Sequence, residues 1–481
     1  MVLVLACLGA AASLSKLRST IEDVPVVDIG SSLTPLTEVT EPRNFLIIGT
    51  DSASGFDPDD PRTEGRDMTG QLADVIMILR VDPRDGSAQL LSIPRDSRVA
   101  VAPDGTMARI NGAISAGGDE GPRNLVQTIK RNFGISVDNY VEVDFKSFTD
   151  LVDVLGGVPV YFTTPVRDRM SGLFVDEPGC IMLDPDQALA YARSRTFEYR
   201  TESGWQVDGS GDLGRITRQQ DFIKRALRRA SDQGVRNPST AVGVVNAAAA
   251  SVRMDDTLDV GTILTLMREF QNFNPEELAS TQVPTFFDPR GGVAYQSIDW
   301  DEADLLLEPF RGVEPGAVIE PRNVIVDVRG REAEEPGLEA IADQLDGVGF
   351  DAEVYFNRST VSRTTITHGP RGRDAAVLLA AQLEVLPDFV EDDEISGYRV
   401  ELEPGTDFAG IRPEAVPVES LPLELLPPPT TVVDEPVPDE PPPGEPAEPE
   451  SPPEVAEDPT VTTEPPPGVV PTDPQQAATC R

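Results

Sequence analysis

The chain has 481 residues, more than one compact domain usually contains, so two or three structural units are expected. It carries 40 Lys and Arg against 82 Asp and Glu, and the resulting net charge of −42 excludes general binding to a nucleic-acid backbone. A single late histidine, His368, excludes Ser-His-Asp and Cys-His catalysis in the first two thirds of the chain.

The three cysteines, Cys7, Cys180 and Cys480, show no CxxC pair and no metal-finger spacing. This pattern excludes a structural zinc site. The cysteines also lie far apart in the sequence, so we do not expect a disulfide framework.

The N-terminal residues suggest export. Met1–Leu14 is apolar throughout and is followed by Lys16 and Arg18, but a bilayer span takes about 20 residues. No basic segment precedes the apolar run, as it would in a signal peptide, so we interpret residues 1–17 as the outer part of a membrane anchor and 18–42 as a linker. The alternatives are a lipoprotein cleavage box ending at Cys7 and a buried N-terminal helix.

The region 43–310 opens with apolar runs that predict buried strands. Residues 44–50 predict a strand that delivers Asp51 to its end, and residues 74–82 predict a second strand beginning at Asp74. Residues 88–97 predict a third strand, which Pro94 ends just before Arg95 and Asp96. Because ligands of open α/β sheets bind at strand ends, these polar residues are candidates for a site. An ordinary solvated turn is the alternative.

Helices alternate with strands in the next segment. Residues 121–133 predict a helix, 140–145 a strand, and 146–157 a helix that closes at a glycine pair. Asp184 followed by Pro185 predicts a helix start, and this helix ends near Arg193. Another helix opens at Asp212. The alternation predicts a layered α/β sandwich.

Basic residues concentrate between Arg193 and Ala230, where nine Lys and Arg face five Asp and Glu. On the helix that opens at Asp212, the spacing places Arg215, Arg218 and Gln219 on one face near the N-terminus. Guanidinium groups beside the positive end of a helix suit a pyrophosphate. A surface helix in a chain that prefers arginine to lysine is the alternative. Asp51 and Asp74 are hard oxygen ligands, so Mg²⁺ is the expected metal.

Two further regions follow. Residues 322–404 alternate between predicted strands and helices and indicate a small α/β domain with no catalytic constellation. Within it, His368 lies at a predicted strand end beside Gly369 and Pro370, where an ordinary turn residue is expected rather than a catalytic one. Residues 421–481 are rich in Pro, Glu and Asp and predict a disordered, extended acidic tail.

The motifs of the region 43–310 resemble the LytR-CpsA-Psr family in order and spacing. The segments that carry the resemblance are Ile48–Asp51, Ala73–Asp74, Ser92–Asp96, Arg109–Asn111, Ala190–Arg195 and Asp212–Gln220. The region 322–404 resembles the LytR C-terminal domain that often follows. The resemblance implies an αβα sandwich with a mixed central sheet and a membrane-anchored enzyme outside the cytoplasm, facing the cell wall.

The resemblance also implies a reaction: transfer of a glycopolymer from a polyprenyl-pyrophosphate carrier to peptidoglycan through a phosphodiester bond. By position, Asp51 and Asp74 would hold Mg²⁺ and act in catalysis with Arg95. The pyrophosphate would be bound by Arg95, Arg109, Arg193, Arg195, Arg215, Arg218 and Gln219, with Asp96 and Asp212 in support. The family's usual lysine is Arg109 here. The segment between Asp51 and Asp74 carries competing carboxylates, namely Asp57, Asp59, Asp60 and Asp67.

Other functions remain open. A hydrolase would use the same site with water in place of a sugar hydroxyl, and a cell-wall-binding scaffold would need no catalytic residues. A transcriptional regulator is disfavoured by the anchor, the charge and the lack of a basic helix-turn-helix.

Overall fold

The computed structural model describes residues 25–34, 41–50, 72–234, 252–258, 262, 273–313, 318–357, 361–392, 395–421 and 480. The expected anchor over residues 1–17, Asp51 with its competing carboxylates, and the tail apart from residues 421 and 480 lie outside this part. None of the helices that can be described is both long and apolar enough to cross a bilayer.

A seven-stranded mixed sheet forms the centre of the larger unit, with strand order β1-β14-β7-β2-β3-β4-β15. The strands span Val26–Val27, Val252–Asp255, Asn139–Val143, Arg43–Thr50, Ala73–Asp82, Ser87–Ser92 and Ala279–Gln282 in that order. Strand β2 pairs antiparallel with β3 and parallel with β7, and β3 pairs antiparallel with β4. The three strands predicted first are therefore confirmed, with β4 ending two residues before Pro94.

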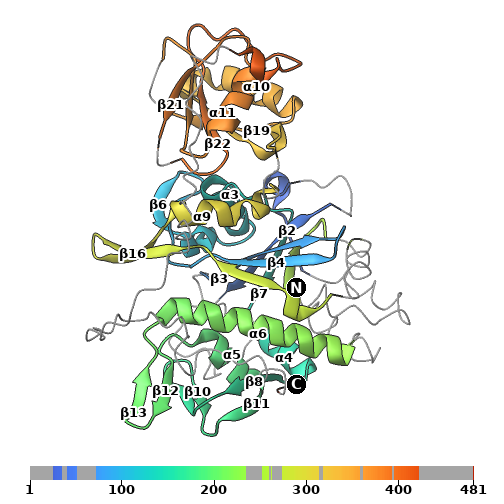
Figure 1. The fold of residues 1–481 in the computed structure, drawn as a ribbon, viewed down its shortest axis with the longest axis vertical. Coiled ribbons are helices and arrows are strands. Elements are labelled where there is room, and N and C mark those ends of the chain that lie inside the picture. The colour runs from blue at the N-terminus through green and yellow to red at the C-terminus, as the bar shows by residue number, and fades with distance from the viewer. Residues whose placement is uncertain are drawn as a thin grey trace, which may run out of the picture.

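Helices cover both faces of this sheet (Figure 1). Helices α3 (Glu120–Phe133) and α9 (Trp300–Leu307) lie on one face, where their apolar side chains join one core with the sheet. Helices α4 (Phe145–Val154), α5 (Pro185–Arg193) and α6 (Gly211–Gly234) lie on the other, around a second core that includes Leu155, Tyr191 and Phe222. The expected mixed central sheet within an α/β fold is confirmed.

Short strands surround helices α4 to α6. Strands β8 (Val158–Phe162) and β11 (Gly179–Leu183) form one pair. Four strands form a small sheet in the order β10 (Leu173–Val175), β9 (Val166–Asp168), β12 (Glu198–Thr201) and β13 (Gly204–Val207). Two hairpins complete the unit, β5 (Arg98–Val101) with β6 (Thr106–Arg109), and β16 (Thr285–Arg290) with β17 (Val293–Ile298).

Side chains mark the helix starts that the sequence predicts. The Asp184 carboxylate accepts a 2.9 Å hydrogen bond from the backbone N–H of Gln187, and Pro185 occupies the first position of α5. The Asp144 carboxylate caps α4 in the same way by accepting from the N–H of Ser147 at 2.8 Å. Short 3₁₀ turns span Gly30–Ser32, Ile110–Ala116, Pro275–Glu277, Pro309–Arg311, Pro321–Asn323, Glu332–Glu334 and Val418–Ser420.

A second unit follows in the chain. Five strands are ordered β19-β18-β22-β20-β21 and span Asp351–Phe356, Ile325–Gly330, Arg399–Glu403, Thr365–His368 and Asp388–Glu391. Helices α10 (Glu335–Gly347) and α11 (Arg373–Gln382) pack against one face of this sheet. The sequence pattern did not predict β21, a four-residue edge strand whose mostly exposed side chains give no apolar pattern. His368 lies at the end of β20, as expected, and its side chain is buried.

Cys180 and Cys480 form a disulfide. They are 300 residues apart in sequence, yet their Cα atoms lie 5.2 Å apart. The expectation that these cysteines are too distant to pair was wrong, because chain folding brings the end of the sequence back to strand β11.

Candidate functional site

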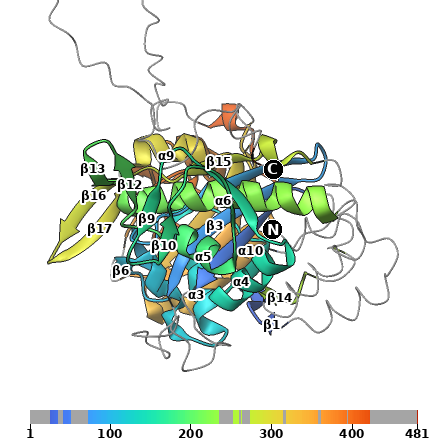
Figure 2. The same cartoon turned by 90° about the horizontal axis from the view of Figure 1, so that it is seen from below.

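The site lies where the N-terminus of α6 meets the start of β3 and the turn after β4. In the view of Figure 2, α6 lies across the sheet that contains β3. A small recess, too narrow in this structure to hold a water molecule, is found there. Its lining consists of Asp74, Val75, Ile76, Met77, Ser92, Ile93, Arg95, Arg215, Ile216 and Gln219. Four of the residues that the sequence singled out, Asp74, Arg95, Arg215 and Gln219, therefore share one concave surface.

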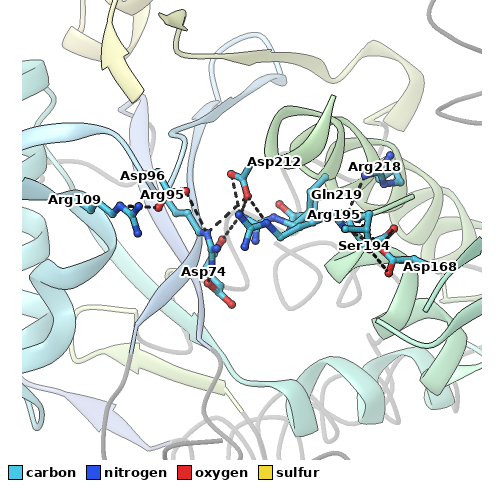
Figure 3. A network of polar contacts seen from close by, with 12 residues as sticks. Asp74, Arg95, Asp96, Arg109, Asp168, Ser194, Arg195, Asp212, Arg218 and Gln219 are labelled. Carbon is cyan, nitrogen blue, oxygen red and sulfur yellow. Dashed lines mark hydrogen bonds and ion pairs between the residues drawn. The ribbon is translucent and has the colours of Figure 1, made fainter. Parts of the chain in front are cut away.

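Arg95 connects Asp74, which lines the recess, with Asp96 and Asp212 beside it (Figure 3). Its Nη1 donates a short hydrogen bond to the Asp74 carboxylate, and its Nε lies 3.7 Å from Asp212 Oδ1 and 4.0 Å from Asp96 Oδ2. Strand β4 ends at Ser92, and the chain turns out of the sheet through Pro94, so that Arg95 reaches toward Asp212 of α6. Arg95 therefore bridges the sheet and the helix.

Arg215 extends this network from the helix. Its Nη2 donates to the backbone carbonyl of Asp74 at 3.1 Å and lies 3.0 Å from Asp212 Oδ1. Arg195, from the segment after α5, lies 3.2 Å from the same Asp212 oxygen. Asp212, which was expected only to support the site, is thus the carboxylate on which three arginines converge.

Arg109 lies at the edge of the network. Its Nε is 3.2 Å from Asp96 Oδ1, and its guanidinium donates to the carbonyl of Ala294 at 3.0 and 2.6 Å. The backbone N–H of Gln296 donates to the Asp96 carbonyl at 2.9 Å. Hairpin β16–β17 therefore fixes both Arg109 and Asp96.

The arrangement concentrates positive charge. Four arginines, Arg95, Arg109, Arg195 and Arg215, share three aspartates, Asp74, Asp96 and Asp212. Burial lowers the pKa of Arg215, and the nearby Arg95 and Arg195 lower it further against the attraction of Asp212. Burial also lowers the pKa of Arg95, but Asp74 and Asp212 outweigh this effect and raise it above its usual value. A bound anion would relieve the crowding of cations.

Two buried donors of the network, Arg95 Nε and Arg215 Nε, have no hydrogen-bond partner among the described residues. Asp96 Oδ1 and Asp212 Oδ1 also accept no hydrogen bond there, but they lie 3.2 and 3.0 Å from arginine nitrogens in ion pairs. Unpaired buried donors and acceptors are costly and call for an explanation. Their position around the recess is that expected of a site which completes its hydrogen bonds with a polar ligand.

Arg218 lies behind this surface, whereas Gln219 is part of it. The Arg218 guanidinium is fully buried, pairs with Asp208 at 3.1 Å and donates to the carbonyl of Ser194 at 2.8 Å. Gln219 lines the recess, but its amide donates to the carbonyl of Ala192 at 2.9 Å. The expectation that Arg218 presents its charge to a ligand is not met, because α6 is packed on both sides and Arg218 points into the protein.

The remaining arginine of the prediction, Arg193, ends α5 with its guanidinium carbon 4.8 Å from the centre of the Phe145 ring. Phe145 and Phe222 belong to the apolar environment of α4 to α6, where Phe148 and Phe222 stack with ring centres 5.1 Å apart. The described contact of Arg193 is therefore with an aromatic ring of this environment, and the structure does not bring Arg193 into the network of described residues around Asp212.

Sequence reasoning missed two aspartates that organise the site, Asp168 and Asp208. Asp168 lies at the end of a three-residue strand, and Asp208 follows a hairpin. Neither has a motif or a spacing that separates it from the other acidic residues of this chain. Only their contacts reveal what they do.

The expected metal site is described only in part, because Asp51 lies outside the described residues. Among those residues, no group of three or more His, Cys, Asp or Glu side chains could hold a metal ion. Mg²⁺ commonly takes one or two protein carboxylates together with phosphate oxygens of a substrate, so the Asp74 carboxylate beside the arginine-lined recess fits half of such a site.

Comparisons with known proteins agree with the motifs. The chain is 33% identical over 223 residues to the probable cell wall biosynthesis protein LcpB of Corynebacterium glutamicum, covering 45% of this chain and 50% of LcpB. It is 30% identical over 219 residues to the polyisoprenyl-teichoic acid--peptidoglycan teichoic acid transferase TagU of Halalkalibacterium halodurans, covering 46% and 62%. The chain thus spans about half the length of these relatives.

Solved structures also match. The LytR-Csp2A-Psr enzyme from Actinomyces oris has 23% sequence identity and a TM-score of 0.47, with 61% of this chain and 96% of that chain covered. The family model described as LytR_cpsA_psr family matches residues 9–309, well over half of the chain. The protein therefore belongs to the LytR_cpsA_psr family.

Proposed function

We propose that this protein is a phosphotransferase that attaches a glycopolymer, carried on polyprenyl pyrophosphate, to peptidoglycan. The observation that carries the proposal is the arginine-rich recess at the start of α6, where four arginines share three aspartates and two buried arginine donors lack hydrogen-bond partners among the described residues. Such a recess suits a ligand with two linked phosphates. Family membership and the names of the TagU relatives support the same reaction.

The reaction joins a sugar hydroxyl of peptidoglycan to the phosphorus that carries the glycopolymer. The bond from this phosphorus to the bridging oxygen breaks, and polyprenyl phosphate leaves with its electron pair. Arg95, Arg195 and Arg215 would hold the two phosphates and stabilise the charge that develops on the leaving group. Mg²⁺, held by Asp74 and Asp51, would neutralise further phosphate charge.

A carboxylate must accept the proton of the attacking hydroxyl. The Asp74 side chain is 26% exposed, compared with 17% for Asp96 and 12% for Asp212. Asp74 is also the one of the three that lines the recess. We therefore assign it as the base among the described carboxylates.

The proposal extends to the rest of the chain. Residues 1–17 would form part of a membrane anchor that places the enzyme outside the cytoplasm and facing the cell wall. The five-stranded unit between Ile325 and Glu403 would be a LytR C-terminal domain, supported by its α/β composition. No role for nucleic acid is proposed, because the net charge of −42 opposes it.

Product analysis tests the proposal against hydrolysis and against a scaffold. The full chain is incubated with a polyprenyl-pyrophosphate-linked oligosaccharide and peptidoglycan fragments, and products are identified by mass spectrometry. A phosphodiester-linked glycan on peptidoglycan is expected, and Arg95→Ala should lower its yield about 100-fold or more because a charge made for the transition state is lost. Arg84→Ala is the matched control, since Arg84 is an exposed arginine paired with one aspartate.

The other outcomes separate the alternatives. Free phosphorylated glycan in place of a peptidoglycan adduct would identify a hydrolase. A scaffold would show no turnover in vitro. In cells, the Arg95→Ala and Asp74→Asn variants would then attach as much glycan to the cell wall as the wild type does.

A further inference from the structure

The segment between α5 and β12 carries Arg195, one of the arginines of the site. Helix α5 ends at Arg193, and Ser194 adopts an extended conformation with φ −63° and ψ 124°. Backbone groups at a helix end have no partner within the helix and must find one elsewhere. The groups that form hydrogen bonds with this segment therefore determine where Arg195 points.

Asp168 accepts hydrogen bonds from one side of this segment. Its Oδ2 accepts hydrogen bonds from the Ser194 hydroxyl at 2.7 Å and from the backbone N–H groups of Arg195 and Thr196 at 3.0 and 2.8 Å. Its Oδ1 accepts from the Thr196 hydroxyl at 2.8 Å. One buried carboxylate thus contacts three consecutive residues, with Arg195 in the middle.

Asp168 is itself fixed by its own turn. Oδ1 also accepts from the backbone N–H groups of Met170 and Ser171 at 2.8 and 3.1 Å. Burial would raise the pKa of Asp168, but the hydrogen bonds from Ser194 and Thr196 outweigh it and lower the pKa to about 2. The group is therefore a carboxylate anion at neutral pH.

Helix α6 holds the opposite side of the segment. Arg218 donates to the carbonyl of Ser194, and Gln219 donates to the carbonyl of Ala192. The guanidinium of Arg218 also stacks over the Phe197 ring, with its central carbon 4.6 Å from the ring centre. Asp168 and α6 thus bind the segment from opposite sides, and these hydrogen bonds fix its position relative to the N-terminus of that helix.

The Arg195 side chain points away from Asp168 and Arg218 and toward Asp212 (Figure 3). It is 46% exposed and lies 3.2 Å from Asp212, on which Arg95 and Arg215 also converge. The backbone of Arg195 is thus bound to Asp168 while its guanidinium joins the anion-binding network. A carboxylate on the other side of the chain sets the location of this guanidinium.

We propose that Asp168 is a positioning residue that places Arg195 for binding pyrophosphate. The identity of the ligand rests on the proposed function. The geometry requires a carboxylate at this position, because every contact that Asp168 makes is with a donor. Both oxygens of Asp168 accept hydrogen bonds, so the NH₂ group of an asparagine would face the donors that bind one of these oxygens. Displacing a charged group by about 1 Å is enough to lose much of its effect at an active site.

A double-mutant cycle tests the proposal with the full chain and farnesyl pyrophosphate as the probe. Calorimetry measures the dissociation constant for wild type, Asp168→Asn, Arg195→Ala and the double variant. Arg195→Ala should weaken binding about 10-fold to 100-fold, as expected for loss of a charged hydrogen bond. Asp168→Asn should weaken it by a similar factor in wild type, but by less than about 2-fold when Arg195 is already alanine, because residues that act together are not additive.

Two milder substitutions control for loss of binding through misfolding. Ser194→Ala removes one hydroxyl bond to Asp168, and Ser147→Ala removes the equivalent Ser-to-Asp bond, to Asp144, at the start of α4. Ser194→Ala should weaken probe binding about 2-fold to 10-fold, whereas Ser147→Ala should leave it unchanged at an equal melting temperature. Equal effects of these two substitutions would overturn the proposal.

The remaining outcomes are distinguishable. If wild type binds the probe and Asp168→Asn has the same effect in both backgrounds, Asp168 acts on the fold generally and the positioning role is wrong. If wild type neither binds the probe nor transfers glycan, the proposed function fails and the positioning role fails with it.

Discussion

Arg218 and Asp208 form an ion pair in which the two side chains are 0% and 1% exposed. A buried pair of this kind gives little net stability relative to apolar residues, but removing one partner leaves an uncompensated buried charge. Arg218 also holds Ser194 in place, because its guanidinium donates a hydrogen bond to the Ser194 carbonyl. Stability and the geometry of the site are therefore joined at Arg218.

The first prediction concerns this pair. Arg218→Ala should lower the free energy of unfolding by about 3–5 kcal/mol, because the Asp208 carboxylate remains buried without its cation. Urea denaturation measures the change. Arg84→Ala, which breaks an exposed pair with Asp82, should lower the free energy by less than about 1 kcal/mol. Equal losses in the two variants would contradict the prediction.

A second prediction follows from the low pKa of Asp168. The folded pKa of about 2 lies below the unfolded value of about 3.9, so this carboxylate stabilises the fold above pH 4 and the contribution disappears as the pH falls toward 2. The shift corresponds to about 2.5 kcal/mol. Melting temperatures of wild type and Asp168→Asn should therefore differ most near pH 7 and converge toward pH 2. A difference in melting temperature that stays constant with pH would contradict this prediction.

The third prediction concerns the metal. If Asp74 holds Mg²⁺ in the proposed reaction, chelation by EDTA should abolish glycan transfer and added Mg²⁺ should restore it. Asp74→Asn should raise the Mg²⁺ concentration needed for half-maximal rate about 10-fold or more, because a ligand charge is lost. The control is Asp85→Asn in the exposed turn between β3 and β4, where the carboxylate accepts only from a neighbouring N–H. An unchanged Mg²⁺ dependence in Asp74→Asn would exclude Asp74 as a ligand.

The fourth prediction concerns the contact between the two units. Lys130 at the end of α3 lies 2.8 Å from both Asp351 and Glu353 of β19. Burial lowers the pKa of Lys130, but the two carboxylates outweigh it and raise the pKa. Lys130→Ala leaves two carboxylates without their cation at this contact.

We expect Lys130→Ala to make the two units unfold separately in differential scanning calorimetry, where wild type unfolds in a single transition. Lys146→Ala provides the control, because Lys146 pairs with Asp150 within one helix and does not connect the units. A single unchanged transition in Lys130→Ala would show that other contacts hold the units together.

The fifth prediction concerns the Cys180–Cys480 bond. Peptide mapping without reductant should recover the two cysteines in one linked fragment. Closing so long a loop should stabilise the fold by a few kcal/mol, so a reductant should lower the melting temperature of wild type but not of Cys180→Ser. Separate peptides before reduction would contradict the disulfide.

Local sequence predicted the elements of the site well. The apolar runs of β2 and β3 have the lengths and boundaries expected of strands buried on both faces, and the start of α5 follows from Asp184 and Pro185. These features depend on the period of the pattern and on capping chemistry, both of which operate within a few residues. Edge strand β21 was missed for the same reason, since exposed side chains leave no period to detect.

The sequence by itself determined the strand and helix order, the accumulation of arginines after α5, and the motifs that place the chain in its family. Tertiary structure decided which side chains meet. Arg218 has the spacing of a ligand-binding residue, but packing on both sides of α6 turns it inward to Asp208. Asp168 has no sequence signal, yet it binds the backbone of Arg195 across 27 positions. Such contacts depend on how separate elements pack, because hydrogen bonds over long sequence separations leave no trace in local pattern or charge.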